Sequence, residues 1–156
     1  VSELGYKYNM TDVAACFGLE QLHHLQSWHG RRVEVVKRYR NGLRNIQGLV
    51  LPDQDNQLTH AWQLFIIQLK PAEWQIDRNK LIQKLHQLGI GTSVHYVPVH
   101  MHSYYAGKYG WQPRDFSMAQ QLAETVISLP LYPALQDHEA TYIIDHIQQL
   151  WEQYSI

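Results

Sequence analysis

The spacing of apolar residues changes from a helical to an alternating period in the middle of the chain, and then changes back. Residues 60–69 (HAWQLFIIQL) alternate in part, which predicts a β-strand with Trp62, Leu64 and Ile66 on one face. Pro71 cannot donate a hydrogen bond to a neighbouring strand, so the strand should end there. Strands that alternate with helices predict a small sheet covered by helices, in an α/β or α+β architecture.

Helical spacing dominates on both sides of this strand. Thr11 is the expected N-cap of the first helix, with Asp12 in its first turn, and Gly30 is expected to separate it from the second helix. Gly89 should end a middle helix, and Asp137 should cap the last one. The expected helices cover residues 11–28, 31–46, 81–88, 116–127 and 137–151. Short extended segments are expected at residues 91–96 and 128–132, with a long loop at 97–113 that holds about one helical turn. The arginines expected to face solvent are Arg31, Arg32, Arg38 and Arg44.

Composition limits the classes of protein to which the chain can belong. The 156 residues are 45% hydrophobic and 17% charged, which indicates one globular domain rather than a disordered chain. Lys and Arg number 13 and Asp and Glu 14, so neither a nucleic-acid-binding nor a membrane-binding surface is expected. Cys16 is the single cysteine, which excludes an internal disulfide and suits the cytoplasm. The chain begins at Val1 rather than Met, and we expect it to be part of a longer chain.

The segment Gly5-Tyr6-Lys7-Tyr8-Asn9 precedes the first expected helix as a polar, glycine-led turn. Backbone N–H groups at a helix N-terminus, the Lys7 ammonium and the Asn9 amide together suit an anion such as phosphate. An ordinary capped turn with a solvated lysine would contain the same residues. Both interpretations remain open from the residues alone.

A second polar segment, residues 95–105, carries three histidines and three tyrosines. Neutral donors and acceptors of this kind suit a hydroxyl-rich, uncharged substrate better than a dense anion. His100 and His102 would share a face on a strand and could bind a metal, but no carboxylate or cysteine lies nearby to complete the site. We therefore expect no metal. The alternative interpretation is that the aromatic residues fold a long loop onto the domain.

These two segments and several others resemble, in the same order, characteristic segments of the DegT/DnrJ/StrS family of pyridoxal-phosphate-dependent sugar-nucleotide aminotransferases. The likeness starts at residues 4–12 (LGYKYNMTD) and in the small-residue helix at residues 14–22 (AACFGLEQL). It continues through residues 60–65 (HAWQLF), 88–96 (LGIGTSVHY), 98–105 (PVHMHSYY) and 128–133 (SLPLYP). The combination in this order is more specific than any one segment.

The resemblance implies the C-terminal part of an aspartate-aminotransferase-like (type I) pyridoxal-phosphate fold, with a small, mostly antiparallel sheet covered by helices. Residues 1–46 would form a loop at the cofactor and dimer interface with its linking helices, and residues 47–156 the C-terminal small α/β domain. The large domain, which binds most of the cofactor and carries the lysine that joins it covalently, would lie upstream. This chain alone should therefore be inactive. Family members are homodimers with shared active sites.

By the same resemblance, Asn9 is the first candidate for contact with the cofactor phosphate of the neighbouring subunit, and Lys7 is the second. Many relatives have asparagine at the position of Lys7 and arginine at that of Asn9, so the amide and the cation are exchanged here. The candidate contacts to the sugar nucleotide are His95, His100, Tyr104 and Tyr105, with His100 favoured. Their expected roles are hydrogen bonding and stacking that position the substrate.

The implied reaction moves an amino group, usually from glutamate, to a keto carbon of a nucleotide-linked deoxysugar. Its products serve surface polysaccharides, glycoproteins or antibiotics. Relatives with histidine in place of the covalently bound lysine remove a hydroxyl group instead, and that position lies outside this sequence. A non-catalytic module that dimerises through the small-residue helix at 14–22 is the remaining alternative.

Overall fold

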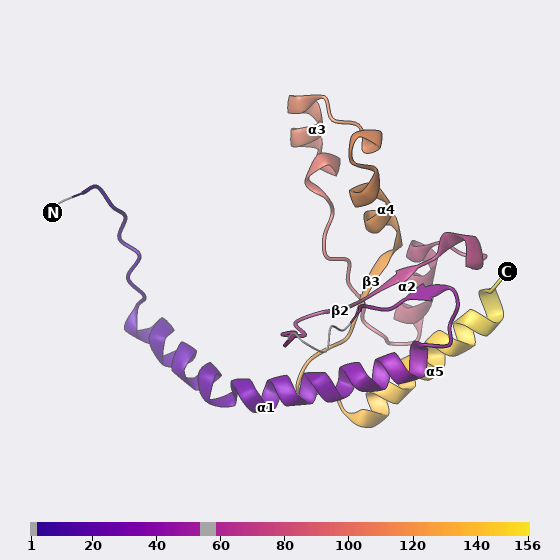
Figure 1. Cartoon of the computed structure of the whole chain (residues 1–156), viewed down its shortest axis with the longest axis horizontal. Coiled ribbons are helices and arrows are strands. Elements are labelled where there is room, and N and C mark those ends of the chain that lie inside the picture. The colour runs from indigo at the N-terminus through magenta and orange to yellow at the C-terminus, as the bar shows by residue number, and fades with distance from the viewer. Residues whose placement is uncertain (1–2, 54–58) are drawn as a thin grey trace.

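The computed structural model describes residues 3–53 and 59–156. Its centre is a three-stranded antiparallel sheet in the order β1-β2-β3, formed by Leu49–Val50, Phe65–Leu69 and Val126–Leu129. Two long helices, α1 (Asp12–Leu43) and α5 (Asp137–Tyr154), and the shorter α2 (Arg78–Gln87) pack beside the sheet (Figure 1). The expectation of a small, mostly antiparallel sheet covered by helices is confirmed.

One helix of 32 residues, α1, replaces the two helices expected on either side of Gly30. It begins as expected: Thr11 Oγ1 accepts a hydrogen bond from the Ala14 N–H at 3.2 Å, and Asp12 lies in the first turn. The expected break at Gly30 was wrong. Glycine adopts helical dihedral angles, and its cost of about 1 kcal/mol relative to alanine does not end a helix whose later turns are held by core packing.

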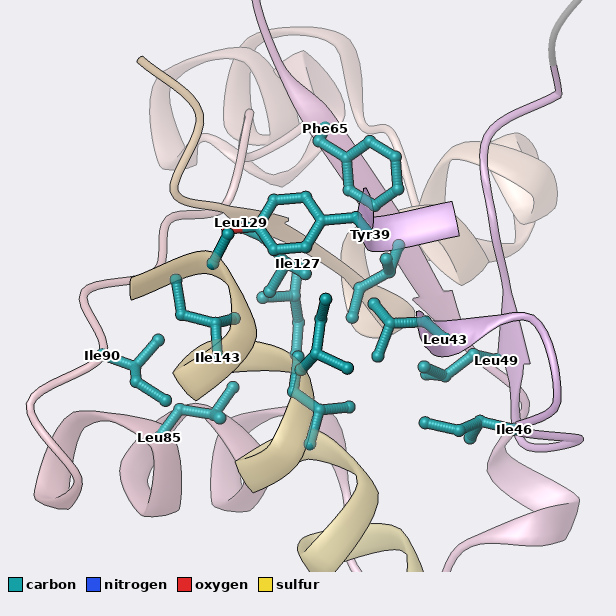
Figure 2. Packing of buried hydrophobic residues seen from close by; sticks show 14 of the residues in the cluster. Tyr39, Leu43, Ile46, Leu49, Phe65, Leu85, Ile90, Ile127, Leu129 and Ile143 are labelled. Atoms are coloured by element: carbon teal, nitrogen blue, oxygen red, sulfur yellow. The ribbon is translucent and has the colours of Figure 1, made fainter. Parts of the chain in front are cut away.

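The second half of α1 and one face of α5 form the core with the sheet (Figure 2). Val36, Tyr39 and Leu43 of α1 are each at most 1% exposed. The apolar stripe expected in the last helix is confirmed, and its buried residues are Ala140, Ile143, Ile144, Ile147 and Leu150. Burial of each large aliphatic side chain contributes about 1.5–3 kcal/mol. Residues on both sides of position 46 share this core, and the division of the chain into 1–46 and 47–156 stays a prediction.

The alternation in β2 does not extend back to Trp62. The buried residues of β2 are Phe65, Ile67 and Leu69. Leu64 and Ile66 are only partly buried. Trp62 is 2% exposed, but it precedes the strand and has a φ of 47°. A residue in the left-handed region turns the chain, so the alternation of faces cannot be counted through it, and the prediction that grouped Trp62 with Leu64 and Ile66 was wrong.

The segment between α2 and β3 contains more helix than expected. The strand expected at residues 91–96 is reduced to one bridge, in which Ser93 exchanges backbone hydrogen bonds of 3.2 and 2.8 Å with Ser128. In place of the expected loop at 97–113 lie the 3-10 helix η2 (Val99–Met101), helix α3 (Ser103–Tyr109) and the start of the 3-10 helix η3 (Pro113–Phe116). Gly110 ends α3 in the left-handed conformation, with a φ of 68°. Helix α4 (Ser117–Thr125) then leads into β3.

Several predicted element ends are confirmed. Gly89, with a φ of 75°, follows the end of α2, and Pro71 follows β2 and begins the 3-10 helix η1 (Pro71–Glu73). The N-cap of α5 is Gln136 rather than the expected Asp137. The Gln136 N–H donates to the Glu139 carboxylate at 2.7 Å, and Asp137 is the first residue of the helix. Asp137 does not serve as the N-cap because its carboxylate binds arginine side chains of α1 instead.

Asp137 joins the start of α5 to α1. Its carboxylate accepts hydrogen bonds from Arg31 at 2.7 Å and from Arg38 at 2.5 Å. Arg31 also donates to the Leu135 carbonyl at 2.6 Å. The hydrogen bond from Arg31, followed by the charge of Arg38, lowers the pKa of Asp137, and the same contact raises the pKa of Arg31. The expectation that Arg31 faces solvent was therefore wrong.

Candidate functional site

Lys7 and Asn9 lie on an N-terminal arm, residues 3–11, that leads away from the sheet (Figure 1). All of these residues are exposed, and residues 4–11 form no regular secondary structure where a turn at Gly5 was expected. Gly5 has no other atoms close enough to require its small size. Neither Lys7 nor Asn9 has a hydrogen-bond partner within residues 3–53 and 59–156. Their donors are therefore available to a group from outside the chain.

The first half of α1 exposes apolar residues on more than one side. Val13, Phe17 and Leu22 are 68%, 70% and 62% exposed. At 100° per residue, Leu22 lies on the side opposite Val13, so large apolar side chains are exposed on opposite sides of this part of the helix, with polar residues such as Glu20 among them. Exposed apolar side chains grouped in this way indicate surfaces that other protein covers. This half of α1 is therefore a candidate interface on two sides.

His95 lies beside the end strand of the sheet. Its Nδ1 is 2.8 Å from Oγ of Ser128, which is 4% exposed, and its ring meets that of Tyr96 edge-on at 4.7 Å. A groove of about 370 Å³ opens beside it, and its other walls include Ile66, Pro98, Leu122 and Val126. His95 thus stands at an apolar groove with its ring oriented by a buried hydroxyl, an arrangement that suits positioning of a ligand.

His100 is buried, with 6% of its surface exposed. Its Nε2 is 3.3 Å from Oε1 of Gln120, and its ring stacks on Phe116 with the centroids 4.9 Å apart. The Gln120 amide in turn donates to the Glu124 carboxylate. These contacts join η2 to η3 and α4. The assignment of His100 as the favoured substrate contact stays a prediction, and little of this residue is open to such a contact.

The metal alternative depended on a strand that would place His100 and His102 on one face. His100 instead lies in η2 and His102 directly follows it, where its Nε2 is 3.3 Å from the Val97 carbonyl oxygen. The two rings therefore have different partners. Within the described part of the chain, no three or more histidine, cysteine, aspartate or glutamate side chains are grouped to hold a metal ion.

Tyr104 and Tyr105 begin α3 and are 65% and 40% exposed. Two further residues, which the sequence analysis missed, lie one turn along the helix: Lys108 Nζ is 5.5 Å from the Tyr104 ring centroid and 5.4 Å from that of Tyr109. Residues four apart on a helix are neighbours, so this spacing was a usable signal that the assignment of a loop concealed. We call Tyr104, Tyr105, Lys108 and Tyr109 the α3 aromatic face.

The two groups of candidate residues do not meet within one chain. The N-terminal arm lies at the far left of Figure 1, at one end of the molecule, and α3 lies at the top, well apart from it. His95, His100 and the α3 aromatic face belong to one continuous segment, residues 95–109. The described structure therefore holds two separate groups of candidate residues.

Comparison with known sequences finds one family and several relatives. The model of the DegT/DnrJ/EryC1/StrS aminotransferase family matches residues 1–148. The spore coat polysaccharide biosynthesis protein SpsC of Bacillus subtilis is 36% identical over 151 residues, which are 96% of this chain and 39% of SpsC. The chain thus spans about two fifths of the length of this relative. In the described residues, no helix has the length and apolar character needed to cross a membrane.

Comparison with solved structures also finds aminotransferases. Spr1654 of Streptococcus pneumoniae, solved in forms with PLP and PMP, matches with a TM-score of 0.85 at 31% identity, over 97% of this chain and 38% of Spr1654. The aminotransferase TlmJ of Streptoalloteichus hindustanus matches with a TM-score of 0.81 at 28% identity, over 98% of this chain and 40% of TlmJ. The fold described above is therefore one part of a larger fold in both proteins.

Proposed function

Because this chain belongs to the DegT/DnrJ/EryC1/StrS aminotransferase family, we propose that it is the C-terminal portion of a cytoplasmic, pyridoxal-phosphate-dependent enzyme that aminates a nucleotide-linked keto-deoxysugar. Glutamate is the proposed amino donor. The product would serve surface polysaccharide, glycoprotein or antibiotic sugar synthesis, and the spore-coat polysaccharide role in the name of SpsC supports the first of these.

The observation that carries the proposal is the exposed arm together with the helix that follows it. Lys7 and Asn9 hold donors with no acceptor among the described residues, and the first half of α1 exposes large apolar side chains on opposite sides. Such a helix needs cover from other protein on two sides. The upstream large domain and the second subunit of a homodimer would supply this cover. The arm would then reach the cofactor phosphate in the neighbouring subunit.

The residues of the arm fit a phosphate group. The Lys7 ammonium and the Asn9 amide both donate hydrogen bonds, and residues 5–11 contain no carboxylate that would repel an anion. Pyridoxal phosphate, when bound, supplies the electron-accepting ring that lets an amino group move between two carbon skeletons. The residues of this chain would hold its phosphate and orient the sugar nucleotide. The proposed substrate contacts are His95, His100, Tyr104 and Tyr105.

The proposal keeps the division of the chain at residue 46. Residues 1–46 would reach the cofactor and the dimer interface, and residues 47–156 would form the small domain. Tyr39 connects the two parts, since its buried hydroxyl donates to the Pro130 carbonyl at 2.9 Å, and burial raises the pKa of that hydroxyl. The helix that links the two parts is thereby anchored in the core.

Replacement of Asn9 by alanine tests the cofactor contact in the longer enzyme that contains this chain. Asn9→Ala removes a charge-assisted hydrogen bond of about 1.5–3 kcal/mol, so retention of pyridoxal phosphate should weaken about tenfold or more. Asn41→Ala is the matched control, because Asn41 is exposed in the last turn of α1. Unchanged retention in Asn9→Ala would transfer the assignment to Lys7, and unchanged retention in Lys7→Ala as well would discard it.

An assay of products separates the proposed reaction from its alternatives. With glutamate and a nucleotide-linked keto-sugar, the longer enzyme should release one 2-oxoglutarate for each aminated sugar. Loss of a sugar hydroxyl without 2-oxoglutarate would indicate a dehydratase of the same family. A stable dimer with neither turnover nor cofactor absorbance would indicate a non-catalytic dimerisation module, the alternative favoured by the exposed apolar surface of α1.

A further inference from the structure

We propose that Arg32 binds a carboxylate of the upstream large domain and thereby holds α1 and the small domain against it. The inference rests on the proposed function, because that function places a further domain before this chain. It goes beyond that function by naming the residue that anchors the contact and the chemistry of its partner.

Arg32 has a buried donor with no acceptor among the described residues. Its side chain is partly buried where we expected it to face solvent, and its Nε is buried without a hydrogen-bond partner. A guanidinium group stays charged at every physiological pH, so it cannot lower the cost of burial by losing its proton. A buried, charged donor of this kind needs an acceptor from elsewhere.

The carboxylates that contact the arginines of this part of α1 are already bound. Asp137 accepts hydrogen bonds from Arg31 at 2.7 Å and from Arg38 at 2.5 Å. Glu34 accepts one from Arg31 at 3.0 Å. Arg32 points about 100° further round the helix than Arg31 and takes part in none of these contacts. Pairing within the described residues therefore leaves the charge of Arg32 without a partner.

A groove of about 440 Å³ opens at Arg32, between α1 and the segment that follows β3. This segment passes α1 near the middle of the helix (Figure 1), and Arg31 fixes it there through the Leu135 carbonyl at 2.6 Å. None of the residues that line the groove is acidic; they are Trp28, Arg31, Arg32, Tyr132, Pro133 and Ala134. With two guanidinium groups and no carboxylate in its walls, the groove suits an anionic partner, and arginine binds carboxylates in a bidentate geometry.

The side of α1 that packs in the core continues through Arg32 into the exposed half. At 100° per residue, Tyr39 and Leu25 lie about 20° to either side of Arg32. Tyr39 is fully buried, whereas Leu25 is 49% exposed. Arg32 therefore lies where the small domain stops covering this side of the helix. A free anion would satisfy the guanidinium group but leave Leu25 exposed, whereas a protein segment with an acidic residue covers both.

The upstream large domain fits this position better than the second subunit does. The N-terminal arm is the part proposed to meet the neighbouring subunit, and Arg32 lies about 30 Å along α1 from the start of the helix. The match covers 39% of SpsC, so most of the length of that relative lies outside it. A partner in the groove would touch both α1 and Tyr132, and would thus set the position of the small domain relative to the cofactor. Arg32 is in this sense a positioning residue.

Zero-length cross-linking of the longer enzyme tests the identity of the partner. Arg32→Lys places an amine at this position, and a carbodiimide joins an amine to a carboxylate that contacts it. Mass spectrometry of the tryptic peptides should show residue 32 joined to an aspartate or glutamate upstream of Val1. In dimers mixed from light and heavy isotope-labelled chains, the joined peptides should carry a single label. Arg44→Lys is the matched control, because Arg44 is exposed at the end of α1 and should give no such product.

A second variant tests whether the acceptor lies outside this chain. In the 156-residue chain alone, Arg32→Met removes an unpartnered buried donor, so the melting temperature should stay the same or rise. In the longer enzyme it leaves the partner carboxylate without its cation, so the melting temperature should fall by about 3 °C or more. Arg31→Met is the matched control. The partners of Arg31 lie within this chain, so its replacement should lower both melting temperatures.

Absence of a cross-link at residue 32 would overturn the proposal, and so would a cross-link to a residue within 1–156 or to the second subunit. A fall in the melting temperature of the 156-residue chain as large for Arg32→Met as for Arg31→Met would also overturn it. The two levels of inference fail separately. Amino transfer by an enzyme without the cross-link would contradict this inference alone, whereas the cross-link in an enzyme that transfers no amino group would contradict the proposed function alone.

Discussion

The two halves of α1 form one continuous helix in opposite surroundings. In the first half, Phe17 and Leu22 are 70% and 62% exposed, whereas in the second half Val35 and Leu43 are fully buried. The second half is held by α5 and the sheet, and the first half is held within this chain by its own backbone hydrogen bonds and by the Thr11 cap. Continuity of a helix therefore does not imply that it serves one purpose along its length.

This contrast predicts different consequences of substitution in the two regions. A change in the packed region should alter the stability of the chain by itself. A change in the exposed half of α1 should alter stability little and should affect only an assembly that covers this half.

The largest effect is expected in the core. Leu43→Ala should lower the free energy of unfolding by about 2–5 kcal/mol, because it removes a fully buried side chain and leaves a cavity. Leu22→Ala is the matched substitution in the exposed half of α1. It should change the free energy of unfolding by at most about 0.5 kcal/mol. Urea unfolding followed by circular dichroism measures both. Equal losses would show that the first half of α1 is also packed within the single chain.

A smaller loss is expected at Gly48, where two aromatic rings approach the backbone. A methyl group at this position would overlap the rings of Trp151 and Trp74, and the Trp74 Nε1–H donates to the Gly48 carbonyl at 2.8 Å. Gly48→Ala should therefore destabilise the chain by about 1–3 kcal/mol. Gly91→Ala, where no atom is close, should stay within about 0.5 kcal/mol of wild type in the same unfolding experiment.

Gly30 lies at the junction of the two halves of α1, and its replacement by alanine should stabilise the chain rather than destabilise it. It is helical, and a methyl group there would meet no atom within 4 Å. Gly30→Ala should raise the free energy of unfolding by about 0.5–1 kcal/mol, because alanine loses less backbone entropy in a helix. A loss of stability in thermal unfolding would show instead that the helix bends or is contacted at this residue.

The smallest effect is expected at Asp137, which ties the packed half of α1 to α5. Its pKa is lowered in the folded chain, so its ionised form stabilises the fold above about pH 4, and this contribution is lost as the pH falls through the lowered pKa. Asp137→Asn should flatten the fall in melting temperature below pH 4. Asp145→Asn, on the exposed side of the same helix, should follow the wild-type profile. A steeper fall for Asp137→Asn would contradict the ion pairs with Arg31 and Arg38.

Features that depend on the chemistry of one residue and its near neighbours were predicted well. Thr11 caps α1, Gly89 follows α2 in a left-handed conformation, and Pro71 stands beyond the end of β2. In each case a side-chain acceptor, a missing Cβ or a missing N–H decides the backbone locally. These signals needed no knowledge of distant contacts.

Features that depend on distant contacts were not predicted. Trp62 was placed on the same face as Leu64 and Ile66, but it lies before β2 in a left-handed conformation that its neighbours in the sequence do not indicate. The helical turns of α3 were hidden in a segment rich in aromatic residues and glycines, and its ring contacts to Trp111 and Phe116 became visible only in space. Lys108 was therefore missed, although its position four residues after Tyr104 is plain in the sequence.

The sequence by itself determined the family, the antiparallel sheet with its helices, and the residues of the arm, because these follow from the order of segments and from local backbone chemistry. Only the tertiary structure decided which face of β2 is buried, that α1 continues through Gly30, and that Lys108 lies between Tyr104 and Tyr109. The reason is physical. Burial and ring contacts join residues far apart in the chain, and their free energies outweigh the small local preferences on which a sequence pattern depends.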